Sequence, residues 1–159
     1  MIRTTRAAFA AAAALSTLTI APAAFAQQAQ PTTTVQGGTS GSVSGRNVSA
    51  GTYGEGYKTT SPDGQSIGVA GGGEATAVDG TASTRTDAKF NDQRAMQKST
   101  AQARTDDERA RSRSRTMVGP NDVVRSRTTT MYKQKGEKPV RETTTTVVRP
   151  DGTTTTRNK

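Results

Sequence analysis

Short runs of Thr and Val alternate with turn signals along most of this chain. From Tyr53 onward these runs are separated by Asp-Gly, Pro-Asp-Gly and Gly-Pro-Asn sequences. The branched Cβ of Thr and Val favours extended backbone, and Asp-Gly between two such runs is a strong signal for a β-hairpin. The pattern therefore predicts a mostly β protein, built as a meander of short, Thr/Arg-rich hairpins.

The predicted turns contain Pro, which presets φ, Asp, which bonds its own backbone, and Gly, which accepts a positive φ. The segments that we expect to form turns or loops are 61–64, 71–73, 79–80, 119–122, 135–138 and 150–152. Few large apolar side chains lie between them. The expected core is a small cluster of Met117, Val118, Val123, Val124, Met131, Tyr132, Val140, Val147 and Val148.

Residues 113–118 and 123–128 are near mirror images on either side of the turn at 119–122. If these four turn residues form the loop, Val118 lies opposite Val123 and no arginine lies directly opposite another. We predict this register, because like charges directly opposite each other destabilise a sheet, by something under ~1 kcal/mol per pair.

The register slipped by one residue would instead set Arg115 opposite Arg127. In the predicted register, Arg113 and Arg115 lie on one face of the ribbon, and Arg125 and Arg127 lie on the other. Both faces would then be basic, so neither could pack against a dry core. We expect this ribbon to stand in water or to lie against an anionic partner.

The segment 87–111 has two interpretations. Asn91 or Asp92 could cap a polar helix near 91–111, because the residues that follow are acceptable helix formers. Apolar residues do not recur there with a helical period, so disorder or two strands joined by a turn at 105–108 are the alternatives. We favour a polar helix or disorder over strands.

The composition divides the chain into five segments. Residues 27–52 are rich in Gln, Gly, Ser and Thr, which is typical of a flexible, disordered linker. The predicted organisation is a signal peptide at 1–26, the linker at 27–52, short β-hairpins at 53–86, a polar segment that is helical or disordered at 87–111, and a basic β-meander at 112–159.

The N-terminus has the pattern of a cleavable secretory signal peptide. Two arginines and no acid are followed by a mostly apolar run at 7–20 and by the triplet Ala24-Phe25-Ala26. The apolar run is shorter than the roughly 20 residues that span a bilayer. We expect cleavage between Ala26 and Gln27, which would make the protein periplasmic or secreted, with no transmembrane segment in the mature chain.

The mature chain of 133 residues is poor in large apolar residues. It contains no Leu, and its Val, Ile and Phe together make up about a tenth of the residues. Fixing each residue costs roughly 1–2 kcal/mol of conformational entropy, which so few apolar side chains cannot offset over the whole chain. We therefore expect a large disordered fraction.

The residue types exclude most catalytic chemistries. Without Cys or His, the chain cannot form a Ser-His-Asp or Cys-His site, or a zinc, copper or haem site built on those ligands. The acidic run at 106–108 does not match a calcium motif, so we interpret it as a solvated charge run. We expect no enzymatic activity, no catalytic residue, no cofactor and no metal.

The charge lies mainly in the C-terminal third. The net charge is +9 for residues 109–159 but −2 for residues 27–108. Such a basic segment favours an anionic partner, and the partners available after export are anionic polysaccharide, lipopolysaccharide, anionic lipid and extracellular DNA. The candidate anion-binding residues are Arg111, Arg113, Arg115, Arg125, Arg127 and Arg141.

We expect a non-enzymatic cell-envelope protein that binds an anionic polymer or surface through this basic meander. The alternative is a self-assembling structural component, because Thr-rich strand edges with weakly specified register can pair between copies of the chain.

Overall fold

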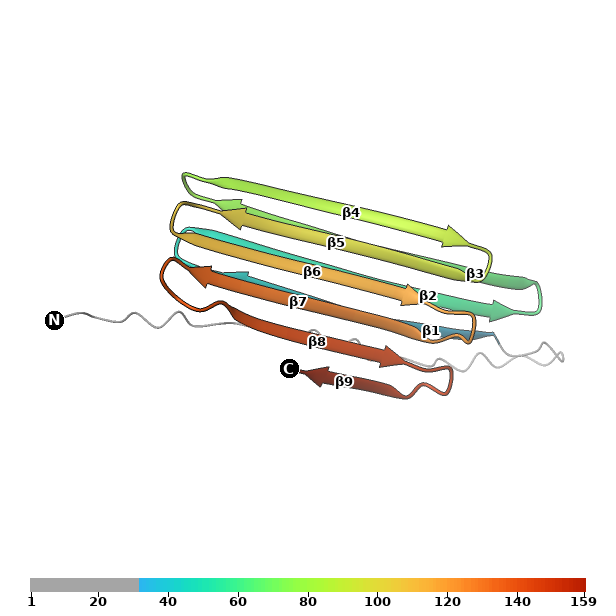
Figure 1. The fold of residues 1–159 in the computed structure, drawn as a ribbon. Coiled ribbons are helices and arrows are strands. Elements are labelled where there is room, and N and C mark those ends of the chain that lie inside the picture. The colour runs from blue at the N-terminus through green and yellow to red at the C-terminus, as the bar shows by residue number, and fades with distance from the viewer. Residues whose placement is uncertain (1–31) are drawn as a thin grey trace.

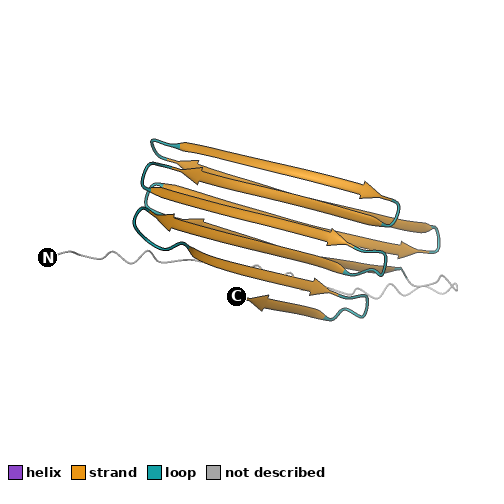
Figure 2. Ribbon diagram, in the orientation of Figure 1, coloured by secondary structure: helices purple, strands orange, loops and turns teal. Residues whose placement is uncertain are grey.

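The computed structural model describes residues 32–159, which form nine antiparallel β-strands joined by turns. Figures 1 and 2 show them as two flat layers whose strand axes are nearly parallel, with neighbouring strands pointing in opposite directions. The strands are β1 (Thr33–Ser44), β2 (Val48–Ser61), β3 (Gly64–Ala77), β4 (Thr81–Asn91), β5 (Arg94–Arg104), β6 (Glu108–Val118), β7 (Val124–Gln134), β8 (Val140–Val148) and β9 (Thr154–Asn158).

The strands form two sheets in chain order. A small sheet has the order β1-β2-β3, and a large sheet has the order β4-β5-β6-β7-β8-β9. The turn at Val78–Gly80 carries the chain from one sheet to the other, and Asp79 has the positive φ of 54° that this turn requires. The small sheet packs face to face on the middle of the large one, with β1 over β7, β2 over β6 and β3 over β5 (Figure 1).

The predicted mostly β meander is confirmed, and so are most of its turns. Chain reversals lie at 62–63, 119–123, 135–139 and 149–153, close to the segments that carry Pro, Asp and Gly. The loop predicted at 71–73 is wrong, because these glycines lie inside β3. Their lack of side chains serves packing: a Cβ on Gly71 would collide with the amide of Gln97 on the opposite sheet.

The linker predicted at 27–52 is wrong where the structure describes it. Residues 33–44 form β1, and β2 begins at Val48; residues 27–31 lie outside the described part of the chain. The composition that suggested a linker has a packing role instead. A Cβ on Gly41 would lie 2.7 Å from Thr128 Cγ2, so a glycine at this position lets the two sheets approach closely.

The polar helix predicted near 91–111 is also wrong, because this segment forms the end of β4, β5 and the start of β6. The less favoured alternative, two strands joined by a turn at 105–108, is the observed structure. Strand alternation buries four small residues of β5 and one glutamine, a set that has no clear apolar period. The buried residues are Ala95, Gln97, Ser99, Ala101 and Ala103.

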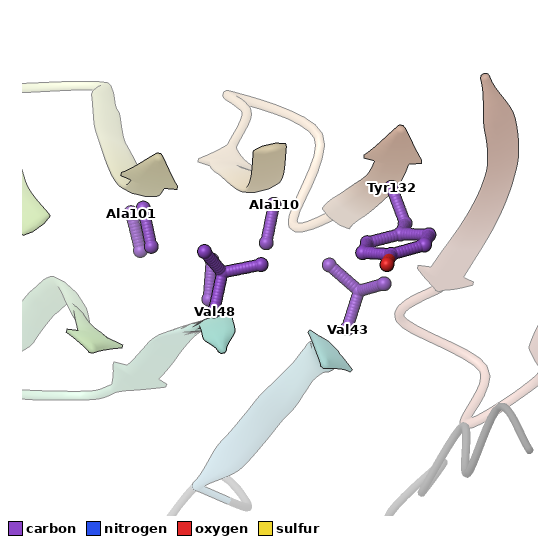
Figure 3. Packing of buried hydrophobic residues seen from close by; sticks show 7 residues of the cluster. Val43, Val48, Ala101, Ala110 and Tyr132 are labelled. Atoms are coloured by element: carbon purple, nitrogen blue, oxygen red, sulfur yellow. The ribbon is translucent and has the colours of Figure 1, made fainter. Parts of the chain in front are cut away.

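Apolar side chains gather in two clusters between the sheets. Figure 3 shows the first, in which Val43, Val48 and Tyr132 pack with small alanines. The second contains Val35, Ala95, Val118, Val124 and Val148. Of the predicted core, Val118, Val124, Tyr132 and Val148 are buried, whereas Met117 and Val140 are exposed.

Hydroxyl groups occupy the space between the two clusters. Thr39 Oγ1 lies 2.7 Å from Ser126 Oγ and 2.8 Å from Thr128 Oγ1, and all three side chains are buried. On the neighbouring strands, Thr52 Oγ1 lies 2.7 Å from Ser112 Oγ. Buried hydroxyls that bond one another avoid the free-energy cost of losing water, so Ser and Thr form an interior here without large apolar residues.

A buried carboxylate holds the β1–β2 turn against the large sheet. Glu108 accepts hydrogen bonds from the backbone N–H groups of Arg46 (3.1 Å) and Asn47 (2.7 Å), and from the Tyr132 hydroxyl (2.7 Å). Burial alone would raise the pKa of the Glu108 carboxyl, but these three hydrogen bonds outweigh it and hold the pKa below its ordinary value. The ionised form of Glu108 therefore stabilises the fold.

We expect Glu108→Gln to lower the free energy of unfolding by about 2 kcal/mol at pH 7, because bonds to a charged acceptor are stronger than bonds to an amide. Since the folded pKa lies below the ordinary value, the contribution of the carboxylate is complete above that value and is lost as the pH falls through the folded pKa. The gap between wild type and variant should therefore close toward pH 3.

Urea unfolding followed by far-UV circular dichroism between pH 7 and pH 3 measures this gap. Glu137→Gln, in the exposed turn between β7 and β8, is the matched control and should leave the stability at pH 7 unchanged. A Glu108→Gln gap that stays constant with pH would contradict the role assigned to the ionised carboxyl.

Candidate anion-binding face

The arginines of β6 all point away from the interior. Because side chains alternate along a strand, burial of Glu108, Ala110, Ser112, Ser114, Thr116 and Val118 turns the residues between them outward. Arg109, Arg111, Arg113 and Arg115 thus form a line along the outer face of the large sheet. Alternate residues on a strand are about 7 Å apart, which sets the spacing of these charges.

The predicted register between β6 and β7 is wrong by one residue. Val118 pairs with Val124, so the loop spans 119–123, and Arg115 lies directly opposite Arg127. The predicted register would have turned the buried face of β7 outward. Val118 and Val124 are each 1% exposed, and burying them with the hydroxyls beside them outweighs a like-charge cost of under ~1 kcal/mol.

The observed register gathers the candidate arginines on one face rather than two. Arg111, Arg113 and Arg115 lie on β6, and their cross-strand partners on β7 show that Arg125 and Arg127 share their side of the sheet. Arg141, on β8, pairs with Met131 and faces the same way. We call this outer surface of the large sheet the basic face. The expectation that both sides of the ribbon are basic is therefore wrong, and the opposite side packs on the small sheet.

Further cations on the basic face were missed from the sequence. They are Arg85, Lys89, Arg94, Lys98, Arg104, Arg109, Lys133 and Arg157. Among the described strand residues, Asp87 is the one carboxylate on this face, and it pairs with Arg85 (2.9 Å). Many Lys and Arg lie two or four positions apart in the sequence, which places them on the same face of a strand. This spacing is the signal that could have identified them.

Cations also line up across the strands. Lys98 pairs with Arg115, which pairs with Arg127. Neighbouring strands lie about 4.8 Å apart, so these charges are closer across the sheet than along a strand. The close spacing makes the basic face a two-dimensional array of positive charge with little acidic compensation among the described strand residues.

Arg111 shows the electrostatic consequence at the centre of the array. Its side chain is half-buried, and its Nε is buried without a hydrogen-bond partner in the described part of the chain. Burial, followed by the charges of Arg113 and Arg109, lowers the pKa of the Arg111 guanidinium. An anion placed here would supply the missing acceptor and would offset the repulsion among the arginines.

The described residues do not contain a group of His, Cys, Asp and Glu that could hold a metal ion. In the acidic run at 106–108, Asp106 and Asp107 are exposed, whereas Glu108 turns inward to hold the β1–β2 turn. Residues 32–159 also contain no helix of the length and hydropathy needed to cross a bilayer.

Comparisons with known proteins found no match among family models, curated proteins or solved structures.

We expect Arg127→Thr to raise the free energy of unfolding at low salt, by a few tenths of a kcal/mol up to about 1 kcal/mol, because it removes the charge opposite Arg115. The gain should vanish near 1 M salt, where the screening length is about 3 Å. Urea unfolding at both salt concentrations measures it. Arg149→Thr, in the turn between β8 and β9, removes an equal charge outside the array and should change stability little. A destabilised Arg127→Thr at low salt would contradict the proposed repulsion.

Proposed function

We propose that this protein is an exported, non-enzymatic component of the cell envelope that binds an anionic polymer or surface through the basic face. The observation that carries the proposal is the array of cations on the basic face. Among the described strand residues on this side of the large sheet, one carries a carboxylate. Binding would neutralise charges that the fold leaves close together, and would release the counterions of the partner.

The shape of the basic face favours an extended partner over a small one. The large sheet is flat in Figure 1, and its cations are distributed over six strands rather than confined to one pocket. A planar cationic surface can contact many anionic groups of a membrane leaflet, a lipopolysaccharide layer or a polyanion at once. Each contact is weak in water, so affinity depends on their number.

Export is supported by the sequence alone. The basic start, the apolar run at 7–20 and the small residues at 24 and 26 match a secretory signal, although residues 1–31 lie outside the described structure. Export separates the protein from cytoplasmic nucleic acid. The partners left for the basic face are anionic polysaccharide, lipopolysaccharide, anionic lipid and extracellular DNA.

A second candidate function, self-assembly into a structural component, is favoured by the free edge of β4. All residues of this strand are exposed, and an edge strand presents unpaired backbone groups that another chain can extend. Charged side chains such as Arg85, Asp87 and Lys89 on this strand oppose tight pairing. Sedimentation at micromolar concentration separates the two functions, because self-assembly requires growth without any polyanion.

We expect the exported protein to bind lipopolysaccharide, phosphatidylglycerol vesicles, polyuronate or duplex DNA with an affinity that falls steeply with salt. A triple variant with Arg111→Gln, Arg113→Gln and Arg115→Gln should bind more weakly to each partner that the wild type binds. For duplex DNA it should make the negative slope of log affinity against log salt shallower by up to about 3, since each lost phosphate contact reduces the magnitude of the slope by about 0.9.

The matched control removes three positive charges from turns: Lys135→Gln, Lys138→Gln and Arg149→Gln. It keeps the net charge of the test variant and should retain most of the affinity. Equal losses in the two triple variants would mean that net charge alone governs binding. Binding that does not change with salt would remove the proposed mechanism.

We expect the mature protein to begin at Gln27. Mass spectrometry of the protein recovered from outside the cytoplasm should give the mass of residues 27–159, including any N-terminal cyclisation of Gln27. Ala26→Phe should leave a membrane-bound precursor, because the peptidase accepts small residues at this position. Ala23→Phe, a control outside the A-x-A triplet, should still be processed. An intact N-terminus in the exported wild type would contradict this cleavage site.

A further inference from the structure

The outer face of the small sheet differs from the basic face in its chemistry. Strand alternation turns Tyr53, Glu55 and Tyr57 of β2 outward, and their cross-strand register places Glu74 of β3 on the same side. The described strands of this sheet place no Lys or Arg there, because Lys58 turns inward and pairs with Asp122 at 2.5 Å. This side is therefore aromatic and weakly acidic.

Both tyrosine rings lie down across glycines of β3. Tyr53 pairs with Gly72, and Tyr57 pairs with Gly68. A Cβ on Gly72 would be 2.8 Å from Tyr53 Cε1 and 3.1 Å from its hydroxyl oxygen, so the ring covers the glycine instead of standing away from it. The two tyrosines are nevertheless 51% and 44% exposed, which leaves one side of each ring open to solvent.

Shallow hollows flank the Tyr53 ring on both sides. One is lined by Gln36, Gly38, Ser40, Tyr53 and Glu55, among others. The other is lined by Ser40, Ser42, Gly51, Tyr53 and Glu74, among others. Glycine supplies part of each lining, so a ligand can approach the backbone closely. The side chains around each hollow bring hydroxyl, amide and carboxylate groups to the rim.

These groups match the chemistry of a sugar ring. A pyranose has apolar C–H faces that stack on an aromatic ring, and a rim of hydroxyls that donate to carboxylate oxygens. Neither Glu55 nor Glu74 has a hydrogen-bond or ion-pair partner in the described part of the chain, and the Tyr53 hydroxyl has none there either. Because the two carboxylates repel anions, the matching sugar is neutral.

The spacing of the tyrosines indicates more than one sugar unit. Tyr53 and Tyr57 lie on the same side of one strand, four residues and therefore about 14 Å apart, with Glu55 between them. We propose that the outer face of the small sheet binds a neutral oligosaccharide that runs along β2 and stacks on Tyr53 and Tyr57. This site does not depend on the anion binding proposed for the basic face.

The test measures calorimetric binding of the exported protein to two neutral hexasaccharides, the N-acetylglucosamine and the glucose β-1,4 hexamers, and to their monosaccharides. At least one hexamer should bind more tightly than its monosaccharide. The double variant Tyr53→Leu with Tyr57→Leu should lose affinity about tenfold or more, because leucine covers the glycines but offers no aromatic face. Tyr53→Phe with Tyr57→Phe keeps the rings and should stay within about threefold.

Comparing hexamer binding by the leucine and phenylalanine variants separates stacking from a merely structural role. If the rings only shield the β3 backbone, the leucine and phenylalanine variants bind hexamer equally, and the proposal is wrong. It is also wrong if neither neutral hexamer binds, or if a polyuronate hexamer binds through the same tyrosines as tightly as a neutral one. Hexamer affinity should not change in the triple variant of Arg111, Arg113 and Arg115. An error in the anion-binding proposal would therefore be seen separately, in the lipopolysaccharide and DNA measurements.

Discussion

The structure depends on the close approach of two sheets whose facing side chains are small. Glycines of the small sheet lie where side chains of the large sheet need room: a Cβ on Gly54 would be 2.6 Å from Thr116 Oγ1 and 2.8 Å from Gln97 Oε1. Hydroxyls such as Thr39 and Ser126 bond each other across the gap. The interior gains little from large apolar side chains, so close contact and satisfied hydrogen bonds replace them. This interior is not fully satisfied, because Gln97 Oε1 is buried without a partner among the described residues.

The same contact determines where the charges lie. Once Ser126 and Thr128 of β7 face inward, Arg125 and Arg127 must face outward beside the arginines of β6. The fold accepts the repulsion between Arg115 and Arg127 because slipping by one residue would bury arginine in a layer too thin to hydrate it. An array of like charges lowers the stability of the fold, so selection for stability alone would disfavour it. Natural proteins break such rules mainly at functional sites.

The two outer faces of the molecule then differ because the two sheets meet by sides that carry mostly small, uncharged residues, with Lys58 and Glu108 as buried exceptions. One face carries arginine and lysine, and the other carries Tyr53, Glu55 and Tyr57. If both proposals hold, the protein connects an anionic partner on one side with a neutral glycan on the other. A flat two-layer domain suits such a role, because binding on either face requires no opening of the interior, and the two sites do not overlap.

Local residue chemistry was enough to predict the strand-rich class, most of the turns and the basic chemistry of the candidate site, because Pro, Asp, Gly and Thr act locally. It led to wrong predictions for the described part of the linker at 27–52 and for the helix near 91–111, since an interior of Gly, Ala and Ser has no hydrophobic period to recognise. The register of β6 and β7, by contrast, depends on how the two sheets pack. A pairwise rule favours keeping Arg115 away from Arg127, but burial of a whole strand face against the small sheet stabilises the observed register by more than that repulsion costs. The side on which the arginines lie is therefore a property of the packed sheets rather than of the hairpin.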